Sequence, residues 1–246
     1  MGILEDMRRI KGDGEWMWVN ASILAIEMAV DAKATSSWLP GGMKLLEPAR
    51  ATVFVADYPE LTIDVDPYHE VALLLHVRFG WMRGVFNPWI LVDDDSAMLL
   101  GREALGCPKK MGEISLTVEG GSVKASVARK GTQLLEVSGT LKGPDSDPPP
   151  FFDRHWITVW GLMGLTVQKL LRWRAEEEIH EAQKVDLTLS VNGSAKDPLH
   201  ELKLGEVLEA RLYRMNFART QSKAMPIPIF PVSPRFMLRN YALRYL

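Results

Sequence analysis

The chain has 246 residues, of which 47% are hydrophobic and 24% charged, and its formal net charge is −2 at pH 7. This composition suits a globular enzyme with a sizeable core and gives no basic footprint for nucleic acid. A single cysteine, Cys107, excludes an internal disulfide framework, and five scattered histidines give no zinc-site spacing. No apolar run reaches about 18 residues, and no signal core begins the chain. We expect one cytoplasmic domain over residues 1–246, with no cofactor and no membrane or nucleic-acid partner.

The first half of the chain is rich in predicted strands, because β-branched and aromatic residues favour extended backbone. These strands cover residues 21–31, 51–57, 70–78 and 85–92. A short helix is expected over residues 32–38. A second helix is expected over residues 97–105, because residues 93–96 offer Asp and Ser as N-cap candidates and Gly106 follows the last apolar residue.

Antiparallel hairpins are predicted in the second half. The expected strands cover residues 113–118, 122–129, 133–141, 185–191 and 207–217. Residues 162–181 fit either a helix or the rim of a strand pair. The proline-rich segment 224–234 is expected to be extended, over the surface or against a partner chain. Turn signals that recur about every 8–12 residues favour a β-sandwich or barrel.

Two adjacent lysines, Lys109 and Lys110, follow Pro108 close to the end of the second predicted helix. Burial and a neighbouring cation both disfavour an ammonium group, and together they can lower a lysine pKa from about 10.4 by up to about 3–5 units. A neutral lysine attacks a ketone and forms a Schiff base, whose iminium accepts electrons. The pair is therefore a candidate site for imine chemistry. The plainer interpretation is a solvated pair at a helix–strand junction.

Glu70 opens a very apolar predicted strand, so burial could raise its pKa and suit it to general acid–base catalysis. The alternative is a strand-end residue in water. Arg102 and Glu103 are expected to brace the second helix, as a buried ion pair if they meet. Four aromatic residues are expected in the core or in the wall of an apolar pocket: Phe151, Phe152, Trp156 and Trp160.

The Gly-Arg-Glu run that begins at Gly101 and the Pro-Lys-Lys run that begins at Pro108 stand at the spacing of the acetoacetate decarboxylase superfamily. The chain resembles that superfamily most strongly from Asp95 to Gly112, and more weakly over residues 20–140. The resemblance implies a mainly β fold, an antiparallel closed or cone-like β-barrel with a few short helices. It also implies assembly as a homo-oligomer.

The resemblance further assigns roles within the candidate site. Lys109 would form the Schiff base with a small keto acid, Lys110 would help to lower its pKa, and Glu70 falls where the superfamily carries a pocket glutamate. Metal ions and organic cofactors play no part in this scheme.

The chain also departs from the superfamily pattern. Val55 aligns with a second glutamate of the decarboxylases, and Asn20 or Ala21 aligns with the arginine that holds the substrate carboxylate. The nearest arginines in the sequence are Arg8, Arg9 and Arg50. We therefore expect weak activity toward acetoacetate and a bulkier or more apolar natural substrate.

Three functions follow as hypotheses. The first is a Schiff-base carbon–carbon lyase of the decarboxylase type, acting on a small keto acid. The second is an aldolase-dehydratase that uses the same lysine on pyruvate-like substrates. The third is a non-catalytic β-barrel that binds apolar small molecules and has no use for a buried amine.

Overall fold

The computed structural model describes residues 14–161, 168–221, 223 and 225–245. The first strands along the chain are β1 (Trp16–Val30), β2 (Met43–Leu45), β3 (Arg50–Tyr58), β4 (Glu60–Leu61), β5 (Tyr68–Phe79), β6 (Met82–Val92) and β7 (Lys109–Met111). They are followed by β8 (Glu113–Glu119), β9 (Ser122–Arg129), β10 (Thr132–Pro144), β11 (Trp156–Trp160), β12 (Lys169–Trp173), β13 (Glu177–Val191), β14 (Leu204–Arg219) and β15 (Ile227–Pro231). The helices are α2 (Ala32–Ser36), α3 (Asp95–Leu105), α4 (Pro234–Tyr245) and the 3-10 helix η1 (Leu199–Leu202).

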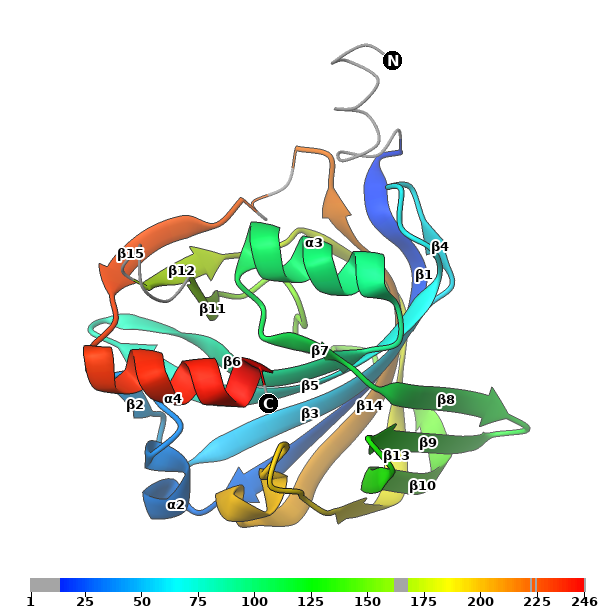
Figure 1. The fold of residues 1–246 in the computed structure, drawn as a ribbon. Coiled ribbons are helices and arrows are strands. Elements are labelled where there is room, and N and C mark those ends of the chain that lie inside the picture. The colour runs from blue at the N-terminus through cyan, green and yellow to red at the C-terminus, as the bar shows by residue number, and fades with distance from the viewer. Residues whose placement is uncertain (1–13, 162–167, 222, 224, 246) are drawn as a thin grey trace.

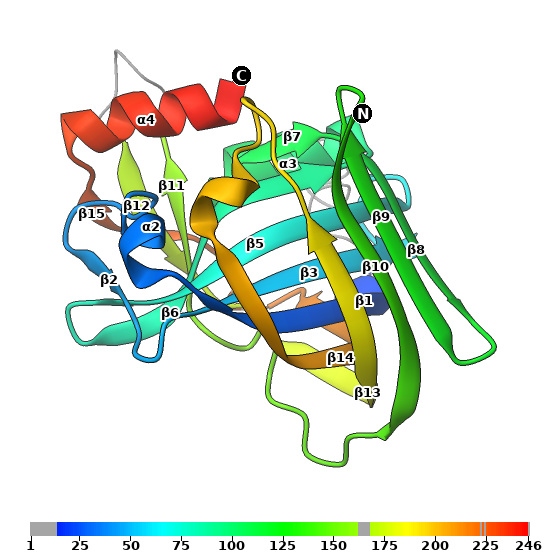
Figure 2. The ribbon, with the colours of Figure 1, turned by 90° about the horizontal axis from the view of Figure 1, so that it is seen from below.

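Within the described residues, the strands form one 15-stranded sheet in the order β15-β12-β11-β6-β5-β3-β1-β14-β13-β10-β9-β8. β2, β4 and β7 pair off this path with β5, β1 and β6. The sheet curls strongly, so that β8 to β10 stand at an angle to β3 and β5 (Figure 2). The mainly β architecture expected from the sequence is confirmed.

Within the predicted antiparallel closed or cone-like barrel, neither the antiparallel pairing throughout nor the closure is confirmed. β6 pairs in parallel with both β7 and β11, and the strand order has two ends, β15 and β8. A parallel neighbour requires a crossover connection. Helix α3 supplies it between β6 and β7, and it lies across the sheet above β7 (Figure 1).

Local signals predicted α3 well. The side chain of Asp94 accepts a hydrogen bond from the amide of Ala97 at 2.7 Å, which caps the first turn. At the other end Gly106 has φ +65°, a left-handed conformation that glycine adopts at little cost, and Pro108 follows. The helix therefore ends at Leu105, and three residues connect it to Lys109, the first residue of β7.

The central strands are buried on both faces. On β3, Val53 and Val55 pack in one hydrophobic cluster, whereas Phe54, Ala56 and Tyr58 pack in the other. Successive side chains of a strand point to opposite faces, so a strand between two cores reads as a continuous apolar run. The second cluster is rich in aromatic residues, and it is the one that contains the candidate site.

Segments with ambiguous patterns were predicted less well. Residues 168–181 form β12 and the start of β13 rather than a helix, while residues 162–167 lie outside the described part. The extended segment contains β15, which pairs with β12, and α4 after it was not predicted. No helix in the described part of the chain is long and apolar enough to cross a membrane.

Candidate active site

Lys109 and Glu70 meet inside the protein. Their side chains come from β7 and β5, which flank β6: Lys109 lies opposite Ile90, and Glu70 lies opposite Val92. The Nζ atom of Lys109 is 2.8 Å from Oε2 of Glu70, and the two residues are only 6% and 7% exposed. The aromatic ring of Tyr68 lies beside the ammonium group, with its centroid 5.2 Å from Nζ. Two residues predicted from the sequence thus form one buried pair.

Helix α3 shapes the space around Lys109. A Cβ atom at Gly101 would lie 2.5 Å from Cε and 2.7 Å from Cδ of Lys109, so only glycine leaves room for this side chain. The neighbouring Arg102 donates from Nη1 to the backbone carbonyl of Lys109 at 2.9 Å. Glu103 is exposed on the same helix, so the buried Arg102–Glu103 pair expected from the sequence does not form. Gly101 and Arg102 therefore position Lys109 together, the first through its side chain and the second through its backbone.

The electrostatic state of Lys109 differs from the expectation. Burial has the largest single effect and lowers the pKa of the Lys109 ammonium, but the charge and hydrogen bond of Glu70, together with smaller contributions from its neighbours, raise it by more in total. The pKa of Lys109 in the free protein therefore lies above its ordinary value. Burial also raises the pKa of Tyr68, so its phenol stays neutral. The amine becomes nucleophilic only when its proton moves to a neighbouring group.

Lys110 points the other way. Its Nζ atom lies 2.5 Å from Oδ1 of Asp197 and 3.1 Å from the carbonyl oxygen of Lys196. Burial lowers the pKa of Lys110, which Asp197 partly offsets. Because adjacent strand residues face opposite sides, the two ammonium groups do not lie side by side as the doubled lysine suggested.

Asp197 is the centre of a polar network that sequence reasoning missed. Besides Lys110, its carboxylate accepts hydrogen bonds from Arg129 at 2.8 Å and from the indole of Trp89 at 2.9 Å. These donors outweigh burial, so the pKa of Asp197 is lowered. Only a long-range fold contact brings this residue to Lys110, and no local pattern marks it.

A cavity of ≈340 Å³ opens beside Lys109 and Glu70. Its wall is mainly aromatic and includes Trp18, Tyr58, Phe152, Trp156, Trp173 and Phe217. The rings of Trp156 and Trp173 stack with centroids 4.8 Å apart, and Phe152 stacks on Phe217 at 4.0 Å. Phe152 and Trp156 are thus both core and pocket wall. Trp160 instead is 38% exposed, and its indole donates to the carbonyl of Glu103.

Three buried polar groups belong to residues that line this cavity and have no hydrogen-bond partner in the part of the chain that the structure describes. They are the side-chain amide of Asn87 and the indole N–H groups of Trp156 and Trp173. Buried polar groups in proteins are nearly always hydrogen-bonded, so an exception inside a cavity indicates a ligand or water. Asn87 is a lone amide in an otherwise apolar strand, which is the sequence signal that could have found it.

The expected departures from the superfamily need correction. Val55 packs in the hydrophobic cluster on the face opposite to Glu70 and does not line the cavity. Asn20 is exposed, and Ala21 is buried in the aromatic cluster. Arg50 bonds Glu27 at 2.6 Å, and residues 8 and 9 lie outside the described part.

One arginine does reach the cavity wall, and the sequence did not predict it. Arg219 stands at the end of β14, opposite Trp16 on β1, and lines the mouth of the cavity. Its guanidinium group pairs with Glu15 and, at 3.7 Å, with Glu176. No group of three or more metal-ligating side chains occurs in the described ranges.

Known proteins resemble this chain in sequence. A sequence model of the family described as Acetoacetate decarboxylase (ADC) matches residues 9–224. Among curated proteins, Decarboxylase DEC1 of Cochliobolus heterostrophus is 24% identical over 97 residues. That match covers 39% of this chain and only 38% of the fungal protein.

Solved structures share the fold at low sequence identity. The structure described in "Structural Studies of Acetoacetate Decarboxylase" has a TM-score of 0.80 at 17% identity, over 89% of this chain and 90% of the other. The acetoacetate decarboxylase of Legionella pneumophila reaches 0.73 at 17% identity, over 89% and 87%. The enduracididine biosynthesis enzyme MppR, solved with pyruvate, reaches 0.71 at 18% identity, over 83% and 88%. With a family match over most of its length and this shared fold, the chain belongs to the acetoacetate decarboxylase family.

Proposed function

We propose that the protein is a Schiff-base carbon–carbon lyase in which Lys109 forms an imine with an apolar keto acid and CO2 is released. The observation that carries the proposal is the buried pair of Lys109 and Glu70, 2.8 Å apart, on the wall of a mainly apolar cavity. Burying two charged groups costs free energy that their pairing only partly offsets, so a buried ion pair beside a cavity favours a functional role. A protein that only binds apolar molecules would have no need for this pair.

The first step is a proton transfer within the pair. Lys109 is protonated in the free enzyme, since the Glu70 carboxylate raises its pKa. When a substrate fills the cavity and displaces water, desolvation favours the neutral form of both groups. The proton then moves from Nζ of Lys109 to Oε2 of Glu70. The neutral amine attacks the keto carbon of the substrate.

Glu70 serves next as the general acid. The carbinolamine loses its hydroxyl group as water when Glu70 returns the proton, which leaves a protonated imine on Lys109 and a carboxylate on Glu70. In a β-keto acid, the bond to the carboxylate carbon then breaks, and its electron pair moves toward the iminium nitrogen. CO2 leaves and a neutral enamine remains. Protonation at carbon and hydrolysis by water release the ketone and restore the amine.

We assign Lys110 a positioning role. Its ammonium group is bonded to Asp197 on the opposite face of β7, so it would act by holding the backbone that carries Lys109. Desolvation of Lys109 by the bound substrate, rather than the charge of Lys110, would then favour the neutral form of the Lys109 amine.

Substrate oxygen atoms have neutral partners available. The unpartnered amide of Asn87 and the indole N–H groups of Trp156 and Trp173 line the same cavity as Lys109. We propose that these donors bind the substrate carboxylate or carbonyl. Because neutral donors hold a carboxylate less tightly than a guanidinium, they also leave it freer to depart as CO2.

Reductive trapping tests the proposal. Borohydride added with a β-keto acid should give one covalent adduct, which intact mass and peptide mapping place on Lys109. The variant Lys109→Arg should give none, while Lys124→Arg, an exposed lysine on β9, should label like the wild type. Labelling that survives in Lys109→Arg would overturn the assignment.

Product analysis then separates the hypotheses. Release of CO2 from a β-keto acid supports the decarboxylase. Turnover of pyruvate with an aldehyde, without CO2, would identify an aldolase-dehydratase that uses the same lysine. Reversible binding without any adduct would identify a non-catalytic binder. A cytoplasmic location and a homo-oligomeric state stay predictions, and light scattering of the purified protein measures the second.

A further inference from the structure

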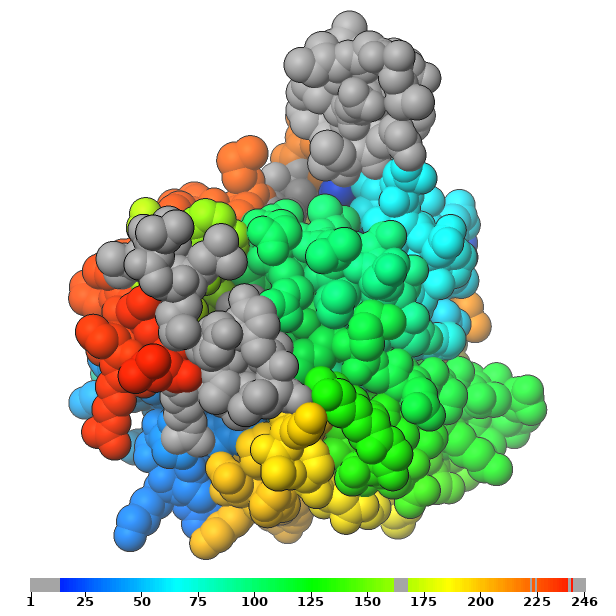
Figure 3. All heavy atoms as spheres, viewed as in Figure 1, coloured from blue at the N-terminus to red at the C-terminus, as the bar shows by residue number. Residues whose placement is uncertain are grey.

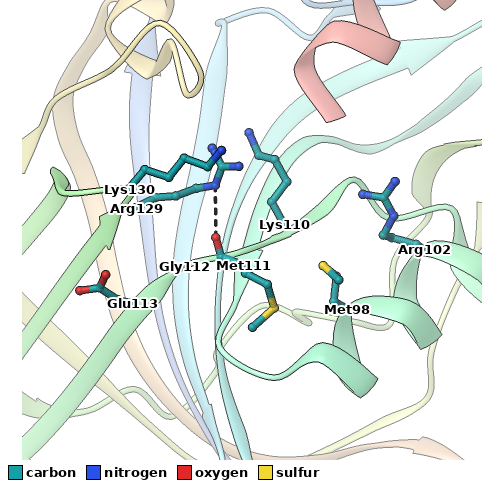
Figure 4. Close-up of a pocket in the computed structure, with 8 residues that line it drawn as sticks. All are labelled: Met98, Arg102, Lys110, Met111, Gly112, Glu113, Arg129 and Lys130. Carbon is teal, nitrogen blue, oxygen red and sulfur yellow. Dashed lines mark hydrogen bonds between the residues drawn. The ribbon is translucent and has the colours of Figure 1, made fainter. Parts of the chain in front are cut away.

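A second cavity of ≈460 Å³ lies on the other face of β7 from Lys109. It is lined by Met98, Arg102, Lys110, Met111, Gly112, Glu113, Arg129 and Lys130 (Figure 4). The helix α3 and the strand β8, both green, belong to the face of the molecule that Figure 3 displays beside α4 in red. The proposed chemistry at Lys109 makes no use of this cavity.

Positive charge dominates the second cavity. Figure 4 shows the nitrogen atoms of Lys110, Arg129 and Lys130 gathered at one side, with the carboxylate of Glu113 well apart from them. Lys110 and Arg129 share a single carboxylate, that of Asp197. Two cationic side chains on one buried anion leave a net positive charge in a low-dielectric setting.

One further lysine, Lys196, lies beside Lys130. The ammonium groups of Lys130 and Lys196 lie within hydrogen-bonding range of each other, and this contact lowers the pKa of Lys130. No salt bridge joins either of them to a carboxylate among the residues that the structure describes. Two cations placed together are stable when an anion lies between them.

The backbone holds the cluster in place. Arg129 donates from Nε to the carbonyl of Met111 at 3.2 Å, the bond drawn dashed in Figure 4. Asp197 receives a backbone hydrogen bond from Leu199 through its own carbonyl, and its amide bonds the hydroxyl of Ser194 at 3.0 Å. Arg129 and Lys110 are thus fixed before any ligand arrives, which lowers the entropic cost of binding.

We propose that this second cavity binds a small anion carrying two or more negative charges, on phosphate or carboxylate groups. Four cationic side chains line it (Arg102, Lys110, Arg129 and Lys130) with the single carboxylate of Glu113, and Asp197 pairs with two of the four. The volume lies within the usual range of small-ligand sites, about 300–1,000 Å³. The whole chain carries a net charge of −2, which argues against an extended polyanion as the ligand.

Titration calorimetry with pyrophosphate and with citrate tests the proposal. The ionic strength is held at about 0.15 M, so that salt screens electrostatic interactions equally in every titration. We expect one site per chain for at least one of the two anions. The anion that binds more tightly tells whether phosphate or carboxylate groups are preferred. Absence of binding by both would overturn the proposal.

The variant Lys130→Asn with Lys196→Gln should weaken binding at least about tenfold, the usual scale for losing a charge-assisted contact. Both lysines are exposed, and asparagine tolerates the left-handed φ of +50° at position 130, so the fold should persist. The control Lys44→Gln with Lys124→Gln removes the same charge from exposed positions elsewhere and should bind normally. Arg219→Gln at the first cavity should also bind normally. An equal loss in either control would show that the anion binds elsewhere or through net charge alone.

Discussion

The buried Lys109, 2.8 Å from Glu70, carries a proton in the free protein, whereas the proposed catalysis requires its neutral amine. The two requirements are compatible because the ionic and neutral forms of the pair carry the same net charge, and the balance between them depends on how much water reaches the pair. In a wet cavity the ionic form is favoured. In a cavity sealed by a substrate, the cost of desolvating two charges favours the neutral form.

Glu70→Gln should separate proton transfer from folding. Removing the carboxylate removes the main group that raises the Lys109 pKa, so burial would dominate and that pKa should fall. Turnover should drop by about 10²–10⁴, the usual contribution of a positioned acid–base group. Trapping with borohydride should persist and extend to lower pH than in the wild type, because the amine is neutral there. An unchanged pH profile of trapping would contradict this account.

Asn87→Leu should lower activity without lowering stability. The substitution keeps a similar volume and removes a buried amide that has no partner in the free protein, so the free energy of unfolding should be unchanged or higher. If Asn87 binds a substrate oxygen atom, kcat/KM should fall about tenfold or more. Urea unfolding and steady-state kinetics read the two effects separately. A variant that loses stability and keeps activity would show that Asn87 is structural.

Asp197→Asn should cost about 3–5 kcal/mol of stability, because it leaves Lys110 and Arg129 buried without their counter-charge. Asp186→Asn is the matched control: its pair with Lys142 is exposed and worth about 0–1 kcal/mol. The lowered pKa of Asp197 fixes the sign of the pH dependence. Its stabilisation is full above the ordinary value of about 3.9 and is lost as the pH falls through the lower folded-state pKa. Urea midpoints at pH 7 and pH 3 measure both effects.

At the scale of the element, α3 connects the fold to the site. Asp94 and Gly106 fix where the helix begins and ends, Gly101 makes room for the lysine side chain, and Arg102 holds its backbone. A short crossover helix between two parallel strands thus sets the position of Lys109 relative to Glu70 on β5.

Gly101→Ala should damage activity and leave stability intact. The added Cβ would meet only the flexible end of Lys109, which can move, and alanine favours a helix by up to about 1 kcal/mol over glycine. A displaced amine no longer meets Glu70, and a misplacement of about 1 Å can cost about 10²-fold in rate. Leu99→Ala, an exposed position on the same helix, should keep both properties. Thermal melting and kcat provide the comparison, and wild-type kcat in Gly101→Ala would refute the positioning role.

At the scale of the whole molecule, sequence reasoning succeeded for structural features that adjacent residues in the chain determine. The strand runs and the caps of α3 are local signals of this kind, whereas Lys109 and Glu70 were selected mainly through the resemblance to the superfamily. Asp197, Arg219 and Trp173 were missed because strand register and long loops bring them to the site from far along the chain. Val55 was expected in the site, but it lies on the other face of β3 from Phe54 and Ala56, because successive residues of a strand alternate between faces.

The aromatic residues around the first cavity also explain the substrate range that we expect. The first cavity is walled by aromatic rings, so each additional CH2 group that a β-keto acid buries there should contribute about 0.8 kcal/mol, or about fourfold in kcat/KM. Activity should therefore be low with acetoacetate and rise along a series of longer 3-oxo acids until the ≈340 Å³ cavity is full.

Ala104→Phe narrows this cavity from an exposed position of α3 and should shorten the preferred chain while acetoacetate turnover is kept. Leu99→Phe, which does not line the cavity, should leave the series unchanged. A headspace assay of CO2 gives kcat/KM for each acid. If acetoacetate were the best substrate in the series, the aromatic wall would serve only to keep water from the amine, and the preference for an apolar substrate would have to be abandoned.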